Sequence, residues 1–509
     1  MADQTAPFVL AIDVGSSSVR ASLYDAQARP LEDTAVREAT ELTITPDGGV
    51  ETSSEELAQR VERTVDGALA RAGARSADIA AVALDAMAYT MCGLDGELRP
   101  ITPFYLYAEG RSAEDASALR RELDFTAVYQ RTGCPLHTSY LPARLRWLRR
   151  TRPDLVRRAR LWVDVATYLY GRWFARADVP ASFSMSSWSG LLDREHLWWD
   201  RDLLRHLDVA EESLPPLADY DHPLRGLAPP FAARWPALRD RPFYLGVGDG
   251  AAANVGSGCV SPQRLALTVG TTGALRLVVT DRVPKVRPGL WAYTVGATET
   301  LLGGALSEGG NVLAWARSAL ALPTAGLDAA LSALTPDGHG LTVLPLLAGE
   351  RSPGWSSHAR SVIEGITPAT SALQILQACL EAVCYRFALV ARLLRPSLGT
   401  PCEIVASGGA LSTSPFWMQL MSDVLQHPLL VSREGELTSR GTAILVLKAL
   451  GAWRTLEDVP LRPEERVEPD ASRAAVYQAA LERQHRLYER LVDPDPVIGP
   501  VLRAVVREG

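Results

Sequence analysis

The sequence predicts an α/β fold made of two similar domains. At 509 residues the chain is too long for one hydrophobic core, so two or more domains are expected. Residues 8–25 and 265–279 each consist of two strand-like apolar runs joined by a turn of Gly, Ser and Thr. Because these hairpin patterns lie about half a chain apart, they indicate a duplicated architecture. Residues 372–394 and 414–425 add long apolar patterns with helical spacing.

The composition is that of an ordinary globular protein, with 47% hydrophobic and 22% charged residues. The net charge of −7 argues against general binding to nucleic acids or acidic membranes and favours a small-molecule enzyme. The arginine-rich segment 144–162 carries two Trp as its only aromatic residues, so it fits a helix-turn-helix surface with solvated arginines better than a nucleic-acid site. We therefore expect no nucleic-acid partner and no membrane partner.

Cysteine usage and the N-terminus indicate a cytoplasmic location. The six cysteines contain no C-x-x-C pair and no regular spacing, so neither a metal framework nor a disulfide framework is expected, and a reducing compartment is favoured. The opening stretch "MADQTAPFVLAIDVG" lacks the basic region and the long apolar core of a signal peptide. No run approaches the ~18 apolar residues of a membrane span.

The first hairpin pattern places an acid next to a turn rich in hydroxyl groups. Asp13 ends the strand candidate 8–14, and Gly15-Ser16-Ser17-Ser18 follows. Backbone N–H groups and hydroxyls in such a turn can cradle phosphate oxygens. Asp13 would then need a bridging cation, usually Mg²⁺, and Arg20 could reach the phosphate as a bidentate donor. A plain hairpin with a polar turn accounts for this segment equally well.

The second hairpin pattern has the same chemistry at Gly270-Thr271-Thr272-Gly273. Further along, Gly408 and Gly409 follow a short apolar strand candidate, and paired glycines there would let the flat ring of adenine approach the backbone. A Walker-A loop is excluded because Lys285 and Lys448 are the only lysines and neither follows a glycine. Phosphate charge must therefore be met by backbone amides, hydroxyls, Mg²⁺ and arginine.

The stretch "GVGDGAAAN" (246–254) allows two interpretations. Gly246, Gly248 and Ala251 fit the G-x-G-x-x-G/A dinucleotide pattern, but that pattern needs an acid about 20 residues later, and the sequence supplies none there. A dinucleotide-dependent oxidoreductase is therefore disfavoured. In the second interpretation, Asp249 is a carboxylate at a strand-to-helix turn, kept ionised by the helix dipole. As an ordinary helix N-cap it would have no chemical role.

Six segments, in this order along the chain, resemble the FGGY family of carbohydrate kinases. They are "AIDVGSSSVR" (11–20), "GVGDGAAANVGSG" (246–258), "LTVGTTG" (267–273), "GGALSEGGNVLAWA" (303–316), "LPLLAGERSPGWSSHARSVIEGI" (344–366) and "ASGGALSTSPFWMQLMSDVL" (406–425). The resemblance covers about residues 8–451. It implies two ribonuclease-H-like domains of the actin/hexokinase/heat-shock-70 superfamily, with a nucleotide and sugar cleft between them. The implied domains are residues 1–256 and residues 257–509, the second ending in a charged helical tail.

The resemblance also implies roles for individual residues. Asp249 is the general base that accepts the proton of the attacking sugar hydroxyl, ATP is the phosphoryl donor, and Mg²⁺ lies near Asp13 and Asp249, held through water. Phosphoryl transfer depends mainly on positioning and electrostatics, which agrees with one carboxylate orienting the nucleophile. The residues implied to bind ATP are Gly15, Ser16, Ser17, Ser18, Arg20, Gly270, Thr271, Thr272, Gly273, Gly408, Gly409, Ala410 and Ser412.

The sugar-binding motifs depart from the family pattern. Where many members have Trp-x-Asp-x-Arg, this chain has Tyr107, Glu109 and Arg111, and where many have Met-His it has Ala88-Tyr89. The segment "RTGCPLH" (131–137) is most similar to the gluconate-kinase branch. In that comparison His137 and Arg111 meet a sugar-acid carboxylate or hydroxyls, although for His137 the interpretation as a structural loop histidine is slightly favoured.

These comparisons rank the possible acceptors. D-gluconate, giving 6-phosphogluconate, comes first, a ketopentose such as xylulose or ribulose second, and glycerol or another polyol third. A non-catalytic ATPase-fold sensor is the rival outside enzymology, and it would need neither Asp249 nor a sugar pocket. The expected partners are the sugar or sugar acid and ATP, and the resemblance leaves a homodimer open.

Overall fold

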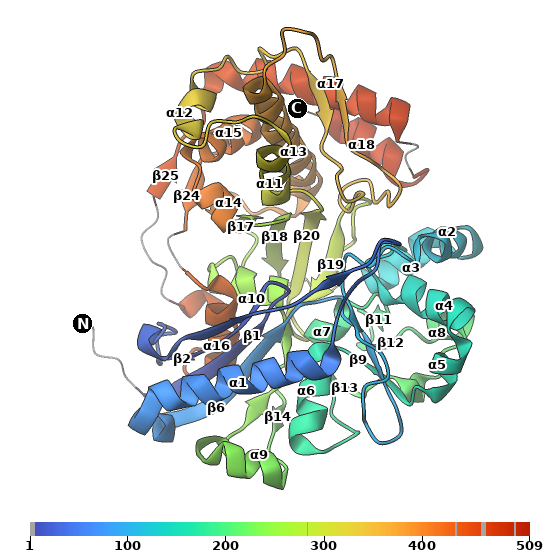
Figure 1. The fold of residues 1–509 in the computed structure, drawn as a ribbon, viewed down its shortest axis with the longest axis vertical. Helices are drawn as coiled ribbons and strands as arrows, with labels where there is room; N and C mark the ends of the chain where they lie inside the picture. Colours follow the sequence, from blue (N-terminus) through green and yellow to red (C-terminus); the bar gives the residue numbers. More distant parts are fainter. Residues whose placement is uncertain (1–5, 282, 433–434, 460–464, 493–494, 509) are drawn as a thin grey trace.

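The computed structural model describes residues 6–281, 283–432, 435–459, 465–492 and 495–508. These residues form two lobes, each built on a seven-stranded mixed sheet (Figure 1). The first half of the chain forms the lower lobe in that view, and most of the second half forms the upper lobe. This arrangement confirms the predicted fold class of two α/β domains.

The first sheet is organised around β1 (Phe8–Val14), a strand whose seven residues are all buried. β1 pairs antiparallel with β2 (Ser18–Tyr24) and parallel with β6 (Ile79–Ala86). An unbroken apolar run suits a strand that has neighbours on both sides and helices on both faces. The sheet order is β14 (Pro223–Leu224), β15 (Phe243–Tyr244), β6, β1, β2 and β3 (Val36–Ala39), and β16 (Val247–Gly248) pairs with β6.

The second sheet repeats this pairing around β17 (Arg264–Val269). β17 pairs antiparallel with β18 (Gly273–Val279) and parallel with β23 (Glu403–Ser407). The sheet order is β19 (Trp291–Thr294), β20 (Thr300–Leu306), β18, β17, β23, β24 (Leu429–Val431) and β25 (Glu465–Val467). The two predicted hairpins are therefore equivalent elements of two related sheets.

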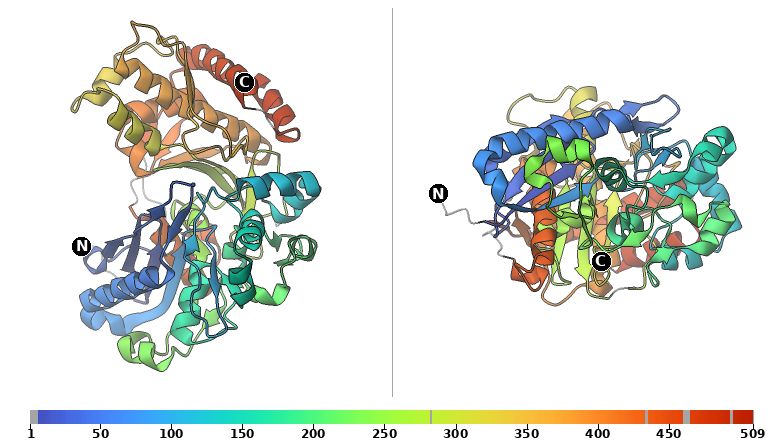
Figure 2. Two further views of the ribbon diagram at one scale, coloured as in Figure 1. Left: turned by 45° about the vertical axis from the view of Figure 1, so that its right-hand side comes forward. Right: turned by 90° about the horizontal axis from the view of Figure 1, so that it is seen from below.

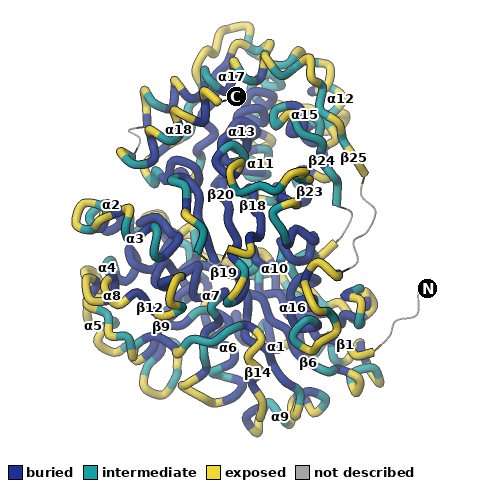
Figure 3. The backbone as a smooth tube through the Cα atoms, turned by 180° about the vertical axis from the view of Figure 1, so that it is seen from behind, coloured by how far each residue is buried: buried dark blue, intermediate teal, exposed yellow. Residues whose placement is uncertain are grey.

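Three long helices cover the outer faces of the sheets. α1 (Ser54–Ala72) packs on β2 and β3, and it begins after Ser53, whose hydroxyl accepts the N–H of Glu56. In the other lobe α13 (Ala372–Leu394) packs on β18 and β20, and α15 (Pro415–Leu425) packs on α13. Both helices lie where the periodicity predicts them. Figure 2 shows the two lobes from two further sides, and Figure 3 shows α13, β18 and β20 coloured mainly as buried.

The helix from Ala372 to Ser397 is also long and apolar enough to cross a membrane by length and composition. However, 83% of its most apolar window is buried inside the protein. A core helix meets the same criterion, so this helix gives no sign of a membrane span.

Two helices that pack against each other lie beside the first sheet. α10 (Asp249–Gly256) follows β16, and α16 (Leu437–Ala449) packs against α10 as well as against β1 and β6 (Figure 1). The backbones approach so closely that a Cβ added to Gly441 would lie 1.8 Å from the carbonyl oxygen of Ala252. A segment late in the chain thus packs on the first sheet.

We expect Gly441→Ala to destabilise the protein by about 1–3 kcal/mol, because the new methyl group meets backbone atoms that no rotamer change can move. The measurement is the free energy of unfolding in urea. Gly96→Ala is the matched control, since no atom lies within 4 Å of a Cβ there, and its stability should change by less than about 0.5 kcal/mol. Equal stability of the two variants would contradict a tight α10–α16 contact.

The arginine-rich segment forms two surface helices, as the sequence predicts. They are α4 (Leu141–Thr151) and α5 (Pro153–Arg158). Arg146 and Arg150 pair with the carboxylates of Glu122 and Asp115. Arg144 departs from the prediction of solvated arginines, because it is fully buried and donates hydrogen bonds to main-chain oxygens, among them that of Ser139.

The predicted tail is a surface layer with more structure than expected. It contains two helices, α17 (Ala474–Leu491) and α18 (Ile498–Arg507), both packed against α13. Gln484 of α17 donates to the carbonyl oxygen of Ala382 in α13. The described part of the tail therefore packs on the second lobe.

Candidate active site

Both hairpins face one cavity of about 390 Å³ between the lobes. Its lining includes the predicted residues Asp13, Gly15, Ser16, Ser17, Arg20, Tyr89, Tyr107, Asp249, Gly270, Thr271, Thr272 and Gly273. Residues that are far apart in the sequence, such as Ser16 and Thr271, therefore meet at one site. This is the most direct structural support for a shared site between the domains.

The first turn is closed by its own backbone. The N–H of Gly15 donates to the carbonyl oxygen of Ser18 over 3.1 Å, which leaves Ser16 and Ser17 at the tip, where they line the cavity. Ser18 does not line it, because its side chain is buried and its hydroxyl accepts the Nε–H of Arg37 over 3.1 Å. The predicted contact of the Ser18 side chain with ATP therefore has no support in this geometry.

The second turn is held by the start of a helix. The N–H of Gly270 donates to Thr272 O over 3.0 Å, and the N–H of Gly310 donates to Gly270 O over 2.7 Å. Gly310 begins α11 (Gly310–Ala319), and a Cβ on it would lie 2.7 Å from Gly270 O. The positive end of this helix dipole thus lies beside the turn, where it favours an anion such as phosphate.

The predicted adenosine segment lies beside the second hairpin. Gly408 has φ +96°, and a Cβ there would lie 2.4 Å from Val269 O at the end of β17, so the position requires glycine. Gly409 and Ser412 are exposed at the two ends of α14 (Gly409–Ser412), and Ala410 is half-buried. None of these four residues lines the 390 Å³ cavity, so an adenine site on this rim stays a prediction.

Asp249 is the first residue of α10 and lines the cavity, partly exposed to it. The N–H of Gly250 donates to its Oδ1 over 2.8 Å. Burial raises the pKa of Asp249, and the N–H groups of Gly250 and Ala88, together with Arg276, lower it without offsetting the burial. The helix N-terminus acts in the predicted direction, but burial dominates. The result is a carboxylate with raised basicity, suited to accept a proton.

The glycines around Asp249 have a packing role. A Cβ on Gly248 or on Gly250 would lie 2.5 or 2.6 Å from the ring of Trp188, and one on Gly246 would lie 2.4 Å from Ala166. None of the three has a positive φ. The glycines therefore permit close approach of neighbouring side chains, and the resemblance to a dinucleotide pattern is coincidental.

Three buried or half-buried carboxyl groups lie near one another at the first phosphate turn. Asp13 and Asp85 are opposite each other in the register of β1 and β6, and the charge of Asp249 raises the pKa of both. Burial raises the pKa of Asp13 to about 6, which Arg20 at 3.1 Å only partly counteracts, and burial raises the pKa of Asp85 as well. Asp85 Oδ1 is buried and has no hydrogen-bond partner.

This donor set fits a hard cation. Carboxylate oxygens are preferred ligands of Mg²⁺, and a bound cation would stabilise the charged form of the buried Asp13 carboxyl group. Asp13 and Asp249 line the cavity, so they are the residues that would hold the ion, directly or through water. Asp85 does not line it and instead accepts the hydroxyl of Thr442 in α16 over 2.7 Å.

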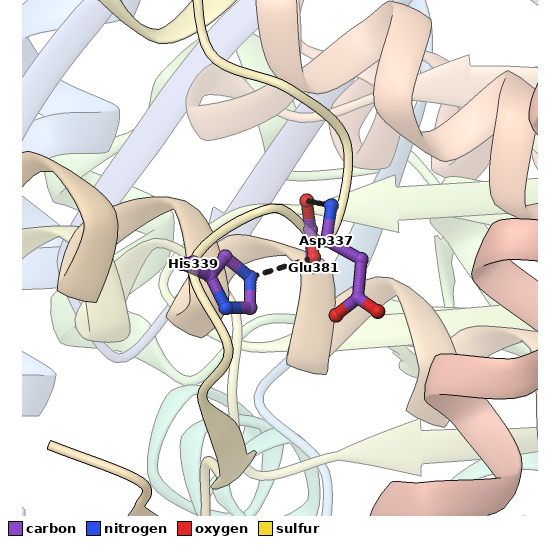
Figure 4. A group of neighbouring side chains, drawn as sticks. All are labelled: Asp337, His339 and Glu381. Carbon is purple, nitrogen blue, oxygen red and sulfur yellow. Dashed lines mark hydrogen bonds and ion pairs between the residues drawn. The ribbon is translucent and has the colours of Figure 1, made fainter.

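Another candidate ion cluster is already saturated by hydrogen bonds. Asp337, His339 and Glu381 lie close together in the second lobe, and Figure 4 shows the ring of His339 directed at Glu381. His339 Nε2 donates to Glu381 over 3.0 Å, and its Nδ1 accepts the N–H of Leu341 over 2.9 Å. The Asp337 carboxylate is bound by Arg483. We interpret this cluster as a structural network that fixes the loop before β21 (Thr342–Leu344) on α13.

The residues predicted to bind the sugar divide into those that line a cavity and those that do not. Tyr89 and Tyr107 line the 390 Å³ cavity, and Tyr107 also lines a neighbouring cavity of about 490 Å³ together with His137. Glu109 and Arg111 line neither. Glu109 is fully buried, with its carboxylate 2.6 Å from Arg111 Nη2, and Arg111 also pairs with Glu51. Substrate contacts for Glu109 and Arg111 stay a prediction that this geometry does not support.

Several site residues were absent from the sequence prediction. Trp188 and Trp291 line the cavity, and Tyr293 stacks on both, with ring centroids at 3.8 and 4.3 Å. Arg276 and Arg351 line it as well. No local pattern identifies them, because they come from separate segments. The only available signal was that arginine must supply the positive charge in a chain with two lysines.

Comparison with known proteins agrees with this geometry. The model of the FGGY family of carbohydrate kinases, N-terminal domain, matches residues 8–256, and that of the C-terminal domain matches residues 265–450. A gluconokinase from Bacillus subtilis (strain 168) is 26% identical over 460 residues, covering 87% of this chain and 88% of its own. A glycerol kinase from Stenotrophomonas maltophilia (strain R551-3) is 28% identical over 505 residues, covering 95% and 97%.

Solved structures show the same fold. A gluconate kinase and a ligand-bound xylulose kinase, both from Lactobacillus acidophilus, each match with a TM-score of 0.87 at 23% identity. Each match covers 95% of this chain and 98% of the other. At this identity the likeness concerns the fold and does not choose between the two acceptors.

Proposed function

This chain belongs to the FGGY family of carbohydrate kinases and is therefore a phosphotransferase that uses ATP, and we propose that its acceptor is D-gluconate, which it converts to 6-phosphogluconate. The alternatives within the family are a ketopentose, xylulose or ribulose, and glycerol or another polyol. A non-catalytic sensor is disfavoured because the carboxylate Asp249 lines the same cavity as both phosphate turns. That shared cavity is the observation on which the proposed phosphoryl transfer rests.

The geometry supports an in-line transfer. In the proposed reaction, Asp249 accepts the proton of the acceptor hydroxyl, whose oxygen forms a bond to the γ-phosphorus of ATP. The bond between that phosphorus and the β–γ bridging oxygen breaks, and ADP leaves. In this proposal the phosphates lie against Ser16, Ser17, Thr271 and Thr272 at the tips of the two turns, and the dipole of α11 beside the second turn stabilises their negative charge. Closure of the two lobes would exclude water and so limit ATP hydrolysis.

When bound beside Asp13 and Asp249, Mg²⁺ would neutralise the phosphate charge. Asp13 lies at the first turn with Arg20, and Asp249 lies at the acceptor side of the same cavity. We further propose that the enzyme works in the cytoplasm, where both ATP and sugar acids are available. A homodimer is the oligomeric state that we propose to test.

The choice of gluconate is supported by the segment 131–137 and by the similarity to gluconokinase. The test is a coupled assay of ADP release over D-gluconate, D-xylulose, D-ribulose and glycerol, with the product identified by ³¹P NMR. We expect kcat/KM for gluconate to exceed the others by about 10-fold or more, since a polar site rejects acceptors that leave its groups unpaired. A higher kcat/KM for xylulose than for gluconate would overturn the proposed acceptor.

A further inference from the structure

The 490 Å³ cavity lies beside the catalytic one, and Tyr107, Thr271, Thr272 and Arg351 line both. Its inner wall contains two buried polar side chains, His137 and Arg351, with hydrogen-bond donors that have no partner. Unpaired buried donors are costly, so their presence in a cavity wall points to a missing ligand. The ligand should be an acceptor of hydrogen bonds.

His137 presents a neutral donor. Its Nδ1 accepts the N–H of Ser139 over 3.1 Å, so the ring proton is on Nε2. Nε2 is buried and makes no hydrogen bond. Burial holds the pKa of His137 well below its usual range, and the charges of Arg120, Arg351 and Arg144 act in the same direction. The ring therefore offers an N–H group at neutral pH.

Arg351 presents an unpaired cation. Its side chain is held by one hydrogen bond, from Nη2 to the carbonyl oxygen of Leu306 over 2.7 Å, and its guanidinium lies 5.1 Å from the ring centre of Tyr107. Its Nε is buried without a partner. Within the described ranges, no carboxylate forms an ion pair with Arg351.

The nearby acids do not neutralise this charge. Glu350 is already bound by Arg386 and by the hydroxyl of Tyr488. Burial raises the pKa of Glu308 to about 8, so Glu308 is mainly protonated at neutral pH. Asp47 also lines the cavity but is exposed at its rim. The charge of Arg351 lowers the pKa of Asp249, but among the residues that the structure describes the two form no ion pair. A buried guanidinium without a direct ion pair favours an anionic ligand.

We propose that Arg351 and His137 bind the carboxylate of a sugar-acid acceptor whose distal hydroxyl reaches Asp249. The inference deepens the proposed function and rests on it. Because Arg351 and Asp249 both line the 390 Å³ cavity, an extended acceptor bound there can reach from Arg351 to the base. Arg351 takes the role that the family resemblance implies for Arg111, whose guanidinium is occupied by Glu109 and Glu51.

The test compares D-gluconate with two neutral analogues, D-gluconamide and D-glucitol, in the wild-type enzyme and in Arg351→Gln. Calorimetry without nucleotide gives Kd, and the ADP-release assay gives KM and kcat. We expect Arg351→Gln to raise Kd and KM for gluconate by about 10- to 100-fold, as for loss of a hydrogen bond to a charged group, and to change both by less than about 3-fold for the neutral analogues. His137→Gln should raise the same constants by less.

Arg239→Gln is the matched control, because it removes one positive charge from an exposed site at the end of a 3-10 helix in the first lobe. It should leave all constants unchanged. If Arg351→Gln does not fold, His137→Gln and the wild-type comparison of gluconate with gluconamide still decide the question. Gluconamide binding as tightly as gluconate to the wild type would overturn the inference.

Two further outcomes separate this inference from the proposed function. If the wild type phosphorylates gluconate and Arg351→Gln lowers kcat equally for every acceptor, Arg351 contacts phosphate, and the carboxylate site is wrong while the gluconate proposal stands. If the wild type phosphorylates neutral sugars and no sugar acid, both the proposed acceptor and the carboxylate site are overturned.

Discussion

Replacing Asp249 with asparagine is expected to lower kcat by about 10²- to 10⁴-fold while ATP still binds. Asparagine keeps the size of the side chain and can accept the N–H of Gly250, but it cannot take up the proton of the acceptor hydroxyl. The phosphate turns at Gly15–Ser17 and Gly270–Gly273 do not depend on Asp249 for their backbone hydrogen bonds. The measurement is kcat from ADP release, together with Kd for ATP from calorimetry.

The pH dependence provides a second signature. Only the ionised carboxylate can act as a base, and burial raises the pKa of Asp249 above that of a free aspartate. The rate of the wild type should therefore fall as the pH decreases through this raised pKa, earlier on the acidic side than an exposed aspartate would allow. The residual rate of Asp249→Asn should lack this acidic limb.

Asp240→Asn is the matched control, since Asp240 is exposed in the first lobe and does not line the cavity. Its kcat should equal that of the wild type. Unchanged turnover in Asp249→Asn would contradict the role of a general base, and loss of ATP binding in that variant would move Asp249 from the transfer step to nucleotide binding.

The predictable parts of the fold are those specified by short segments. The hairpin 8–25 became β1 and β2, and the hairpin 265–279 became β17 and β18, because apolar strands and a Gly-rich turn are local properties. The helix at 372–394 was found at its predicted limits for the same reason. The ordered motifs also identified Asp249, because the short segment around it specifies its strand-to-helix turn.

The parts that escaped prediction depend on contacts between distant segments. Trp188 meets Gly248 and Gly250 only through packing, and Asp85 meets Thr442 because α16 returns to the first sheet. Neither contact leaves a spacing in the sequence. The raised pKa of Asp249 likewise follows from burial, whereas the sequence showed only the helix N-terminus, which acts in the opposite direction.

The Tyr-x-Glu-x-Arg motif shows how one spacing fits two different partners. A carboxylate and a guanidinium two residues apart were expected to face a sugar, and in the structure they bind each other. The arginine also lies over the ring of Trp147, with 4.7 Å between its guanidinium carbon and the ring centre. Glu109 and Arg111 line neither of the two cavities, so their contact with a sugar stays a prediction.

Replacing Glu109 with alanine is accordingly expected to lower the free energy of unfolding by about 3–5 kcal/mol, because it breaks a buried ion pair by removing one partner. Glu109 accepts the N–H of Val50 over 3.3 Å and the N–H of Arg111 over 2.9 Å in addition to the guanidinium. Arg111 would keep Glu51, but these backbone groups would lose their acceptor. The measurement is urea unfolding followed by circular dichroism.

Glu97→Ala removes an exposed carboxylate whose ion pair with Arg99 is largely solvated, so it should cost less than about 1 kcal/mol. The kinetic comparison then separates a structural role of Glu109 from a direct contact with the sugar. If the role of Glu109 is structural, Glu109→Ala should raise KM for gluconate and for neutral acceptors by the same factor, with the loss of stability. A protein of wild-type stability that binds gluconate weakly would show instead that Glu109 contacts the sugar, and the ion pair with Arg111 would then open when substrate binds.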